Sequence, residues 1–79
     1  MTDFDRHVRQ SQEWYRRMNS IRHEQSKTLH DMARLCHVDV HVYAAWELGA
    51  RVPTPVQKEL IEMAFGVAPG EVFGELRAP

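Results

Sequence analysis

The residues best suited to bind a ligand directly are the histidines and the single cysteine. Of the five histidines, His37 and His41 lie four residues apart, and Cys36 precedes the first of them. Imidazole and thiolate are the ligands that zinc prefers. However, Cys36 falls on the inward face of a predicted helix, and a turn between His37 and His41 breaks the helical register. No second ligand pair has a suitable spacing, so we expect no metal site.

The sequence also lacks the residue patterns of catalysis. It contains no glycine-rich loop that would cradle a phosphate and no nucleophile beside a positioned base. A chain of 79 residues leaves little core in which to form a substrate pocket. Glu47, near the end of a predicted helix, is placed to accept hydrogen bonds from the backbone or from an arginine. We therefore expect no enzyme and no cofactor.

The charged residues are unevenly distributed, although the net charge is only −1. Residues 1–25 carry five Arg against four acids, whereas residues 54–79 carry two basic and four acidic groups. A polyanion should therefore meet the first two thirds of the chain. Histidine protonation below about pH 6.5 would add positive charge and should strengthen that binding.

Length and composition predict a single domain over residues 1–79. The chain is 43% hydrophobic and 27% charged, which is typical of a globular protein. One cysteine cannot form an internal disulfide. No apolar run approaches the roughly 20 residues that span a bilayer, and MTDFDRHVRQ lacks the apolar stretch of a signal peptide. We therefore expect a cytoplasmic protein with no membrane partner.

A helical period dominates the hydrophobic pattern, and the first helix is expected over residues 3–23. Its stripe comprises Phe4, Val8, Ser11, Tyr15, Met18 and Arg22, widened by Trp14 and Ile21. The helix is long for so small a domain. Two interpretations remain open: the stripe packs into the core, or Phe4, Val8 and Trp14 bury against a second copy.

Two short helices separated by a tight turn follow. Thr28 is a predicted N-cap with Asp31 three residues later, and Met32, Ala33 and Cys36 form the inward face of that helix. Asp39 is the predicted N-cap of the next helix, which ends at Gly49. Only His37 and Val38 separate the two helices, so they must cross sharply.

Two further helices complete the expected all-α, compact five-helix bundle. Thr54 caps the fourth helix with Pro55 at its first position, and Gly66 ends it. Its predicted inward residues are Val56, Leu60, Ile61, Ala64 and Phe65. The fifth helix is expected around 70–76.

Several of these features together carry a family likeness. Ala33 stands five residues before Val38, and Asp39 follows as a cap. WELGARVP then matches the pattern Trp-Glu-x-Gly-x-x-x-Pro from Trp46 to Pro53 without a gap. GVAPGEVF is similar to a closing Gly-Val-Ser-x-x-x-Leu-Phe. The chain from Ile21 to Phe73 therefore resembles the Cro/C1-type (XRE family) helix-turn-helix regulators.

The resemblance implies a lambda-repressor-like DNA-binding domain with an extended N-terminal helix and a helix-turn-helix core over 28–48. It implies a repressor-like regulator of bacterial or phage type that places the recognition helix 39–48 in the major groove of double-stranded DNA. The base contacts carried over by position are Val40, His41, Ala44 and Ala45. The phosphate contacts are Lys27, Thr28, Leu29, Arg51 and Arg22.

The expected regulator acts as a homodimer, because one small reading helix buries too little surface to compete with nonspecific DNA. The candidate dimer residues are Phe4, Val8, Trp14, Tyr15 and Phe73. The sequence departs from the family at the reading helix, where only His41 is strongly polar. An alternative therefore stays open: an adaptor or antitoxin-like module that binds a protein partner through the apolar face of Val40, Val42, Ala44 and Leu48.

Overall fold

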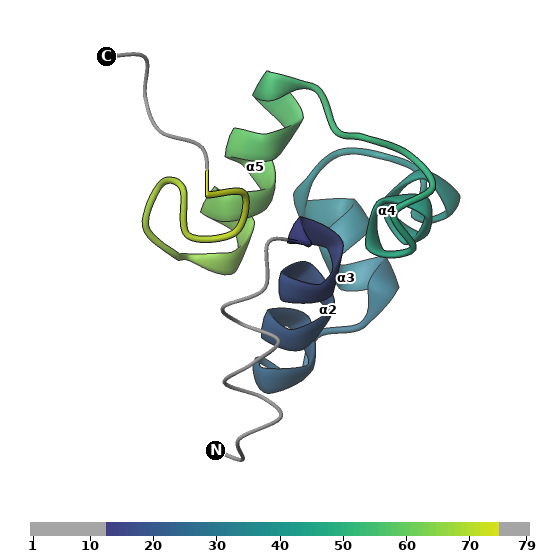
Figure 1. Ribbon diagram of the computed structural model, residues 1–79. Helices are drawn as coiled ribbons and strands as arrows, with labels where there is room; N and C mark the ends of the chain where they lie inside the picture. Colours follow the sequence, from purple (N-terminus) through teal and green to yellow (C-terminus); the bar gives the residue numbers. More distant parts are fainter. Residues whose placement is uncertain (1–12, 75–79) are drawn as a thin grey trace.

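The computed structural model describes residues 13–74, and these form four α-helices (Figure 1). They are α2 (Trp14–Glu24), α3 (Leu29–Leu35), α4 (Val40–Glu47) and α5 (Pro55–Phe65). No strand occurs between residues 13 and 74, so the all-α class is confirmed for this part of the chain. None of the described helices has both the length and the apolar character needed to cross a membrane.

The helices α3, α4 and α5 begin where the predicted caps lie. The Thr28 hydroxyl accepts the backbone N–H of Asp31 at 3.0 Å, and the Asp31 carboxylate accepts that of Thr28 at 2.8 Å. Thr54 and Gln57 form the same reciprocal pair at the start of α5, at 3.1 and 2.9 Å. Each pair satisfies two N–H groups that a helix start leaves without partners. The side chains therefore fix where α3 and α5 begin.

One buried cluster holds the four helices together. Its largest members are Trp46 and Tyr43 of α4, whose rings meet edge to face at 5.8 Å between centroids. The other buried hydrophobic residues are Met18, Ile21, Met32, Ala33, Cys36, Ile61, Phe65 and Val72. Every helix contributes side chains to this cluster, and Tyr43 and Trp46 hold the apolar side of α4 in it.

The first predicted helix is not continuous through residue 13. Glu13 is the N-cap of α2 and has an extended backbone, with φ −82° and ψ 101°. The helix therefore begins at Trp14 instead of running unbroken over 3–23. Phe4 and Val8, the outer part of the predicted stripe, lie outside the described residues.

The predicted fifth helix is wrong within residues 70–74, which form turns against the end of α5. Gly70 and Gly74 have φ of 87° and 64°, in the left-handed region that interrupts a helix. The buried carboxylate of Glu62 accepts the N–H groups of Gly70 at 2.9 Å and Val72 at 3.1 Å. Figure 1 shows this turn on the side of α5 away from α4.

Val56 is a second correction, because it is 68% exposed although its spacing predicts an inward position. It lies in the first turn of α5, whereas the buried residues of that helix begin at Ile61. A hydrophobic period describes one face of a helix but does not say how far along that face neighbouring helices reach.

Candidate nucleic-acid interface

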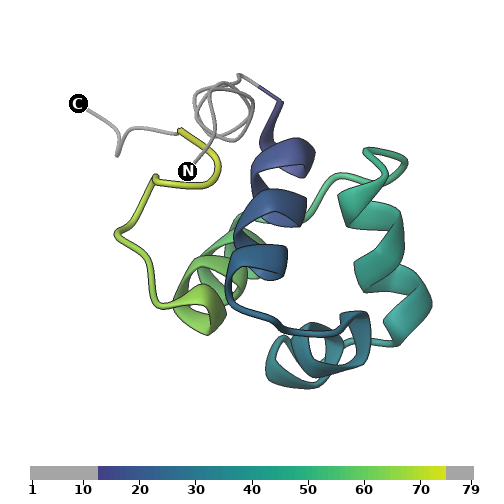
Figure 2. The ribbon, with the colours of Figure 1, turned by 90° about the horizontal axis from the view of Figure 1, so that it is seen from below.

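The turn that joins α3 to α4 sets the orientation of α4. His37 adopts φ 60°, a left-handed conformation that histidine tolerates better than most residues. The next N–H, that of Val38, donates to the Ala33 carbonyl at 3.0 Å, and the half-buried Val38 side chain packs on the core. Figure 2 shows α4 lengthwise and α3 close to end-on, so the two helices cross steeply.

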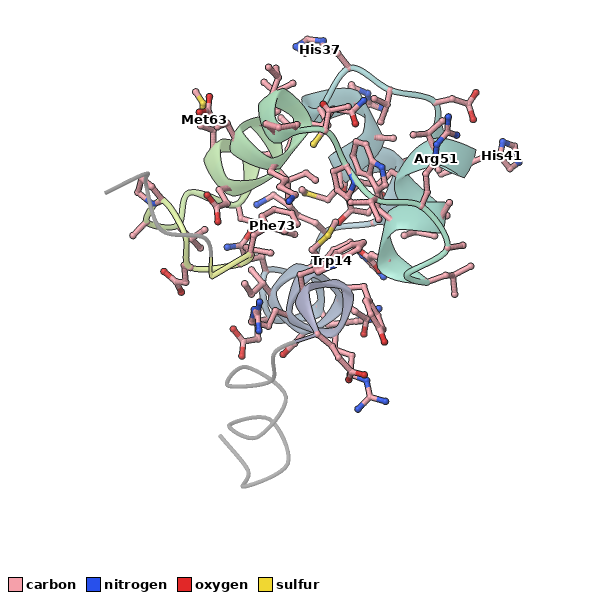
Figure 3. All side chains as sticks on the ribbon, turned by 45° about the horizontal axis from the view of Figure 1, so that its top comes forward. Trp14, His37, His41, Arg51, Met63 and Phe73 are labelled. Atoms are coloured by element: carbon pink, nitrogen blue, oxygen red, sulfur yellow. The ribbon has the colours of Figure 1, made fainter. Side chains whose placement is uncertain are left out.

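The N-terminus of α4 is organised by one carboxylate. Asp39 Oδ1 accepts the His41 backbone N–H at 2.7 Å and lies 2.9 Å from His41 Nδ1. The backbone hydrogen bond, and then the imidazole hydrogen bond, lower the pKa of Asp39 below its usual value. The His41 side chain is 93% exposed and points away from the protein (Figure 3). This end of α4 therefore presents a fixed polar pair to solvent.

The other three expected base contacts are less accessible than His41. Val40, Ala44 and Ala45 are half-buried. Val40 and its neighbour Val42 also pack against the core. The helix therefore offers one fully exposed polar side chain and a shallow apolar surface beside it.

The expected phosphate contacts separate into free and engaged groups. Arg51 is exposed and projects from the loop after α4 on the same side as His41 (Figure 3). Lys27 is half-buried, and its ammonium donates to Gln25 Oε1 at 2.6 Å, which leaves further donors on the same nitrogen. The Thr28 hydroxyl is used in the α3 cap. The Leu29 side chain packs against the core, so only its backbone N–H could meet a phosphate.

Arg22 is a correction, because its guanidinium is engaged inside the protein. Its side chain is 10% exposed and that of Glu47 is 5% exposed. Arg22 Nε donates to Glu47 Oε2 at 2.7 Å, Nη2 to Oε1 at 3.1 Å, and Nη1 to the Lys27 carbonyl at 2.8 Å. Glu47 raises the pKa of Arg22 through these hydrogen bonds. Arg22 therefore ties α2 to α4 and is not a free phosphate ligand.

Two polar side chains flank this pair. Asn19 Nδ2 donates to Glu47 Oε1 at 3.0 Å. The Tyr43 hydroxyl is buried beside Glu47 and has no hydrogen-bond partner among the described residues. The sequence carried one signal for the Arg22–Glu47 pair: Arg22 lies on the predicted apolar stripe, and a buried arginine requires a partner.

Three of the candidate dimer residues, Trp14, Tyr15 and Phe73, lie within residues 13–74, and they make contacts within the protomer. The Trp14 ring lies 5.8 Å from that of Phe73 and 5.4 Å from that of Tyr15, between centroids. Tyr15 also covers Gly49, where an added Cβ would lie 3.0 Å from the ring. These aromatic side chains are half-buried, and their contact with a second copy stays a prediction. Phe4 and Val8 lie outside residues 13–74.

The exposed apolar surface lies elsewhere. Leu48 is 77% exposed and Val52 67% exposed, and both follow α4 directly. Val56, at the start of α5, continues the series, and Met63 is exposed further along that helix (Figure 3). The segment 48–56 therefore carries three of the exposed large apolar side chains of the described residues, and Leu35 of α3, at 46% exposure, is another.

A shallow pocket of about 340 Å³ lies between α5 and the following turn. Glu59, Glu62, Met63, Val67 and Pro69 line it. This acidic and apolar lining does not suit a polyanion, and Figure 3 places Met63 across the protein from His41 and Arg51. The candidate interface is therefore the outer surface of α4 and not this pocket.

Among residues 13–74, no group of three or more His, Cys, Asp or Glu side chains is arranged to hold a metal ion. Burial raises the pKa of the Cys36 thiol to about 11, which keeps it protonated at neutral pH.

No protein-family model, curated protein or solved structure matches this chain.

Proposed function

We propose that the protein is a sequence-specific double-stranded DNA-binding transcriptional regulator of the Cro/C1 type that acts as a homodimer. The observation that carries the proposal is the α3–turn–α4 unit, in which α4 crosses α3 steeply and keeps its N-terminal end exposed. A helix held in this way can enter the major groove while the helix before it crosses the phosphate backbone. Tyr43 and Trp46 anchor its opposite side in the core.

The charges around α4 support binding to a polyanion. Arg51 is exposed on the loop after α4, and Lys27 stands just before α3. In the proposed complex, both contact phosphates and fix the register of α4, which adds affinity without sequence information. Arg22 contributes indirectly, because its bond to the Lys27 carbonyl holds the start of α3 against α2.

His41 is the residue proposed to read a base directly. Ala44 and Ala45 offer small apolar contacts, which suit the methyl group of thymine. With so few polar groups on α4, the remaining specificity comes from the shape and deformability of the DNA.

The proposed dimer surface shifts from the aromatic residues of α2 to the segment 48–56. Trp14 and Phe73 contact each other within one protomer, whereas Leu48, Val52 and Val56 are exposed. A two-fold interface pairs the same surface on both copies, so the exposed apolar side chains of one copy would meet those of the other. Its position directly after α4 would couple the two reading helices across the dimer axis.

A protein-binding module is the second candidate, favoured by the 77% exposure of Leu48, which directly follows α4. Two of its four proposed contact residues, Val40 and Val42, already pack against the core. That burial reduces the apolar area open to a partner, so DNA is the better-supported ligand.

The decisive experiment selects bound duplexes from a random pool and then measures affinity against salt concentration. A DNA-binding protein should lose affinity steeply as salt rises, because phosphate contacts release counterions. Arg51→Ala should weaken all duplexes alike, whereas His41→Ala should alter the selected motif. Absence of binding at any salt concentration would reject the regulator and leave the protein-binding module.

A further inference from the structure

The hydrogen bonds of Asp39 determine which nitrogen of His41 carries its proton. An ionised carboxylate has only acceptors, and Asp39 Oδ1 lies 2.9 Å from His41 Nδ1. The hydrogen between these atoms must therefore belong to Nδ1. The same oxygen accepts the His41 backbone N–H at 2.7 Å, so the N-cap that starts α4 also orients the imidazole.

Fixing the proton on Nδ1 leaves Nε2 as the outward group. A neutral imidazole has one donor and one acceptor nitrogen, and the partner of one nitrogen sets the role of the other. His41 is 93% exposed, and its ring points away from the protein (Figure 3). The unprotonated Nε2 therefore presents a hydrogen-bond acceptor at the tip of the reading helix.

We infer that the Asp39–His41 pair makes α4 select an exocyclic amino group in the major groove, namely N6 of adenine or N4 of cytosine. This inference rests on the proposed function. Among base edges in that groove, only these amino groups donate, whereas guanine N7 and O6 and thymine O4 accept. An acceptor on His41 beside an anionic Asp39 is repelled by guanine and thymine at that position.

The tautomer can be tested on the free protein, without any DNA. At about pH 8, imidazole nitrogen-15 shifts should show His41 with the proton on Nδ1 and Nε2 unprotonated. Asp39→Ser keeps a good N-cap but removes the carboxylate, so the two tautomers should become mixed. A wild-type ring protonated on Nε2 would overturn the inference, whatever the protein does with DNA.

The base preference is tested by selecting duplexes from a random pool at about pH 8. One position should favour adenine or cytosine about fivefold, as expected for a single hydrogen bond. His41→Ala and Asp39→Ser should lose this preference, whereas the control Arg51→Ala should keep it with weaker binding.

The outcomes separate this inference from the proposed function. A selected motif that does not change with His41→Ala overturns the inference and leaves the regulator intact. Failure to bind any duplex overturns both, even if the nitrogen-15 shifts show the expected tautomer.

Discussion

At the scale of single residues, the Arg22–Glu47 pair is the main polar link in a small core. Both side chains are at most 10% exposed, and they join α2 to the end of the proposed reading helix. Removing one member of such a pair leaves a buried charge without its partner, which is strongly destabilising. The pair therefore fixes the end of α4 against α2.

Glu47→Gln should lower the free energy of unfolding by about 3 kcal/mol, because Arg22 would remain charged and buried. Urea denaturation would measure the change. Arg16→Gln is the matched control: its 2.8 Å ion pair with Glu13 is exposed on both sides and should be worth less than about 1 kcal/mol. Equal small effects of the two variants would contradict the structural role of Glu47.

Because the Cys36 thiol is buried, we expect the free energy of unfolding to fall at alkaline pH. Its pKa rises from 9.0 to about 11 because the folded protein buries the thiol. The folded state therefore favours the neutral thiol, and this stabilisation is complete below about pH 9 and lost as the pH rises through about 11. A shift of this size corresponds to roughly 2–3 kcal/mol.

The measurement is urea denaturation at several pH values, with Cys36→Ala as the comparison. The variant should show a shallower decline between pH 9.0 and about 11. Some decline should remain, since burial also raises the pKa of Tyr43. Identical pH profiles for the two proteins would show that the thiol does not ionise on unfolding.

At the scale of elements, the helix ends followed local chemistry closely. The caps at Thr28, Asp39 and Thr54 were predicted from residue types and are confirmed. Gly49 and Gly66 end their helices with φ of 74° and 72°. These features depend on residues within one turn of each other, which is why sequence alone locates them.

The two glycines give a matched pair of stability predictions. Gly66→Ala should cost about 1 kcal/mol, since the left-handed backbone is strained for alanine but nothing lies within 4 Å of the new Cβ. Gly49→Ala should cost more, because its Cβ would lie 3.0 Å from the Tyr15 ring. Thermal unfolding would rank the variants, and an equal cost would indicate that Tyr15 moves aside freely.

At the scale of the whole molecule, aromatic side chains of α2 and the last turn pack on each other, while apolar side chains after α4 stay exposed. Trp14 and Phe73 close the protomer where α2 meets the last turn. Lys58 extends this cluster, with its ammonium 5.5 Å from the Phe73 ring centroid. Leu48 and Val52 instead remain open beside α4.

The double variant Leu48→Glu, Val52→Glu should therefore yield a folded monomer, because it places like charges across the proposed two-fold interface. Light scattering would give the mass, and circular dichroism would confirm the fold. Trp14→Ser is the contrasting variant and should lower stability by about 3 kcal/mol through loss of a packed ring. A dimer that survives the double substitution would place the interface elsewhere.

The candidate site was predictable only in part. The sequence indicated His41 and Arg51 as exposed polar groups, and both are exposed. It also assigned Arg22 to a phosphate, whereas tertiary packing pairs Arg22 with Glu47, 25 residues away. A partner at that distance leaves no local pattern, because it depends on how two helices are brought together.

The amino-acid sequence by itself determined the helical class, the places where most helices begin and end, and the turn between α3 and α4. These follow from hydrogen bonds and backbone preferences of neighbouring residues. Tertiary structure decided that residues 70–74 form turns, that Val56 is exposed and that Trp14 meets Phe73. Burial is a property of the assembled chain: a side chain leaves water only where distant segments arrive to cover it.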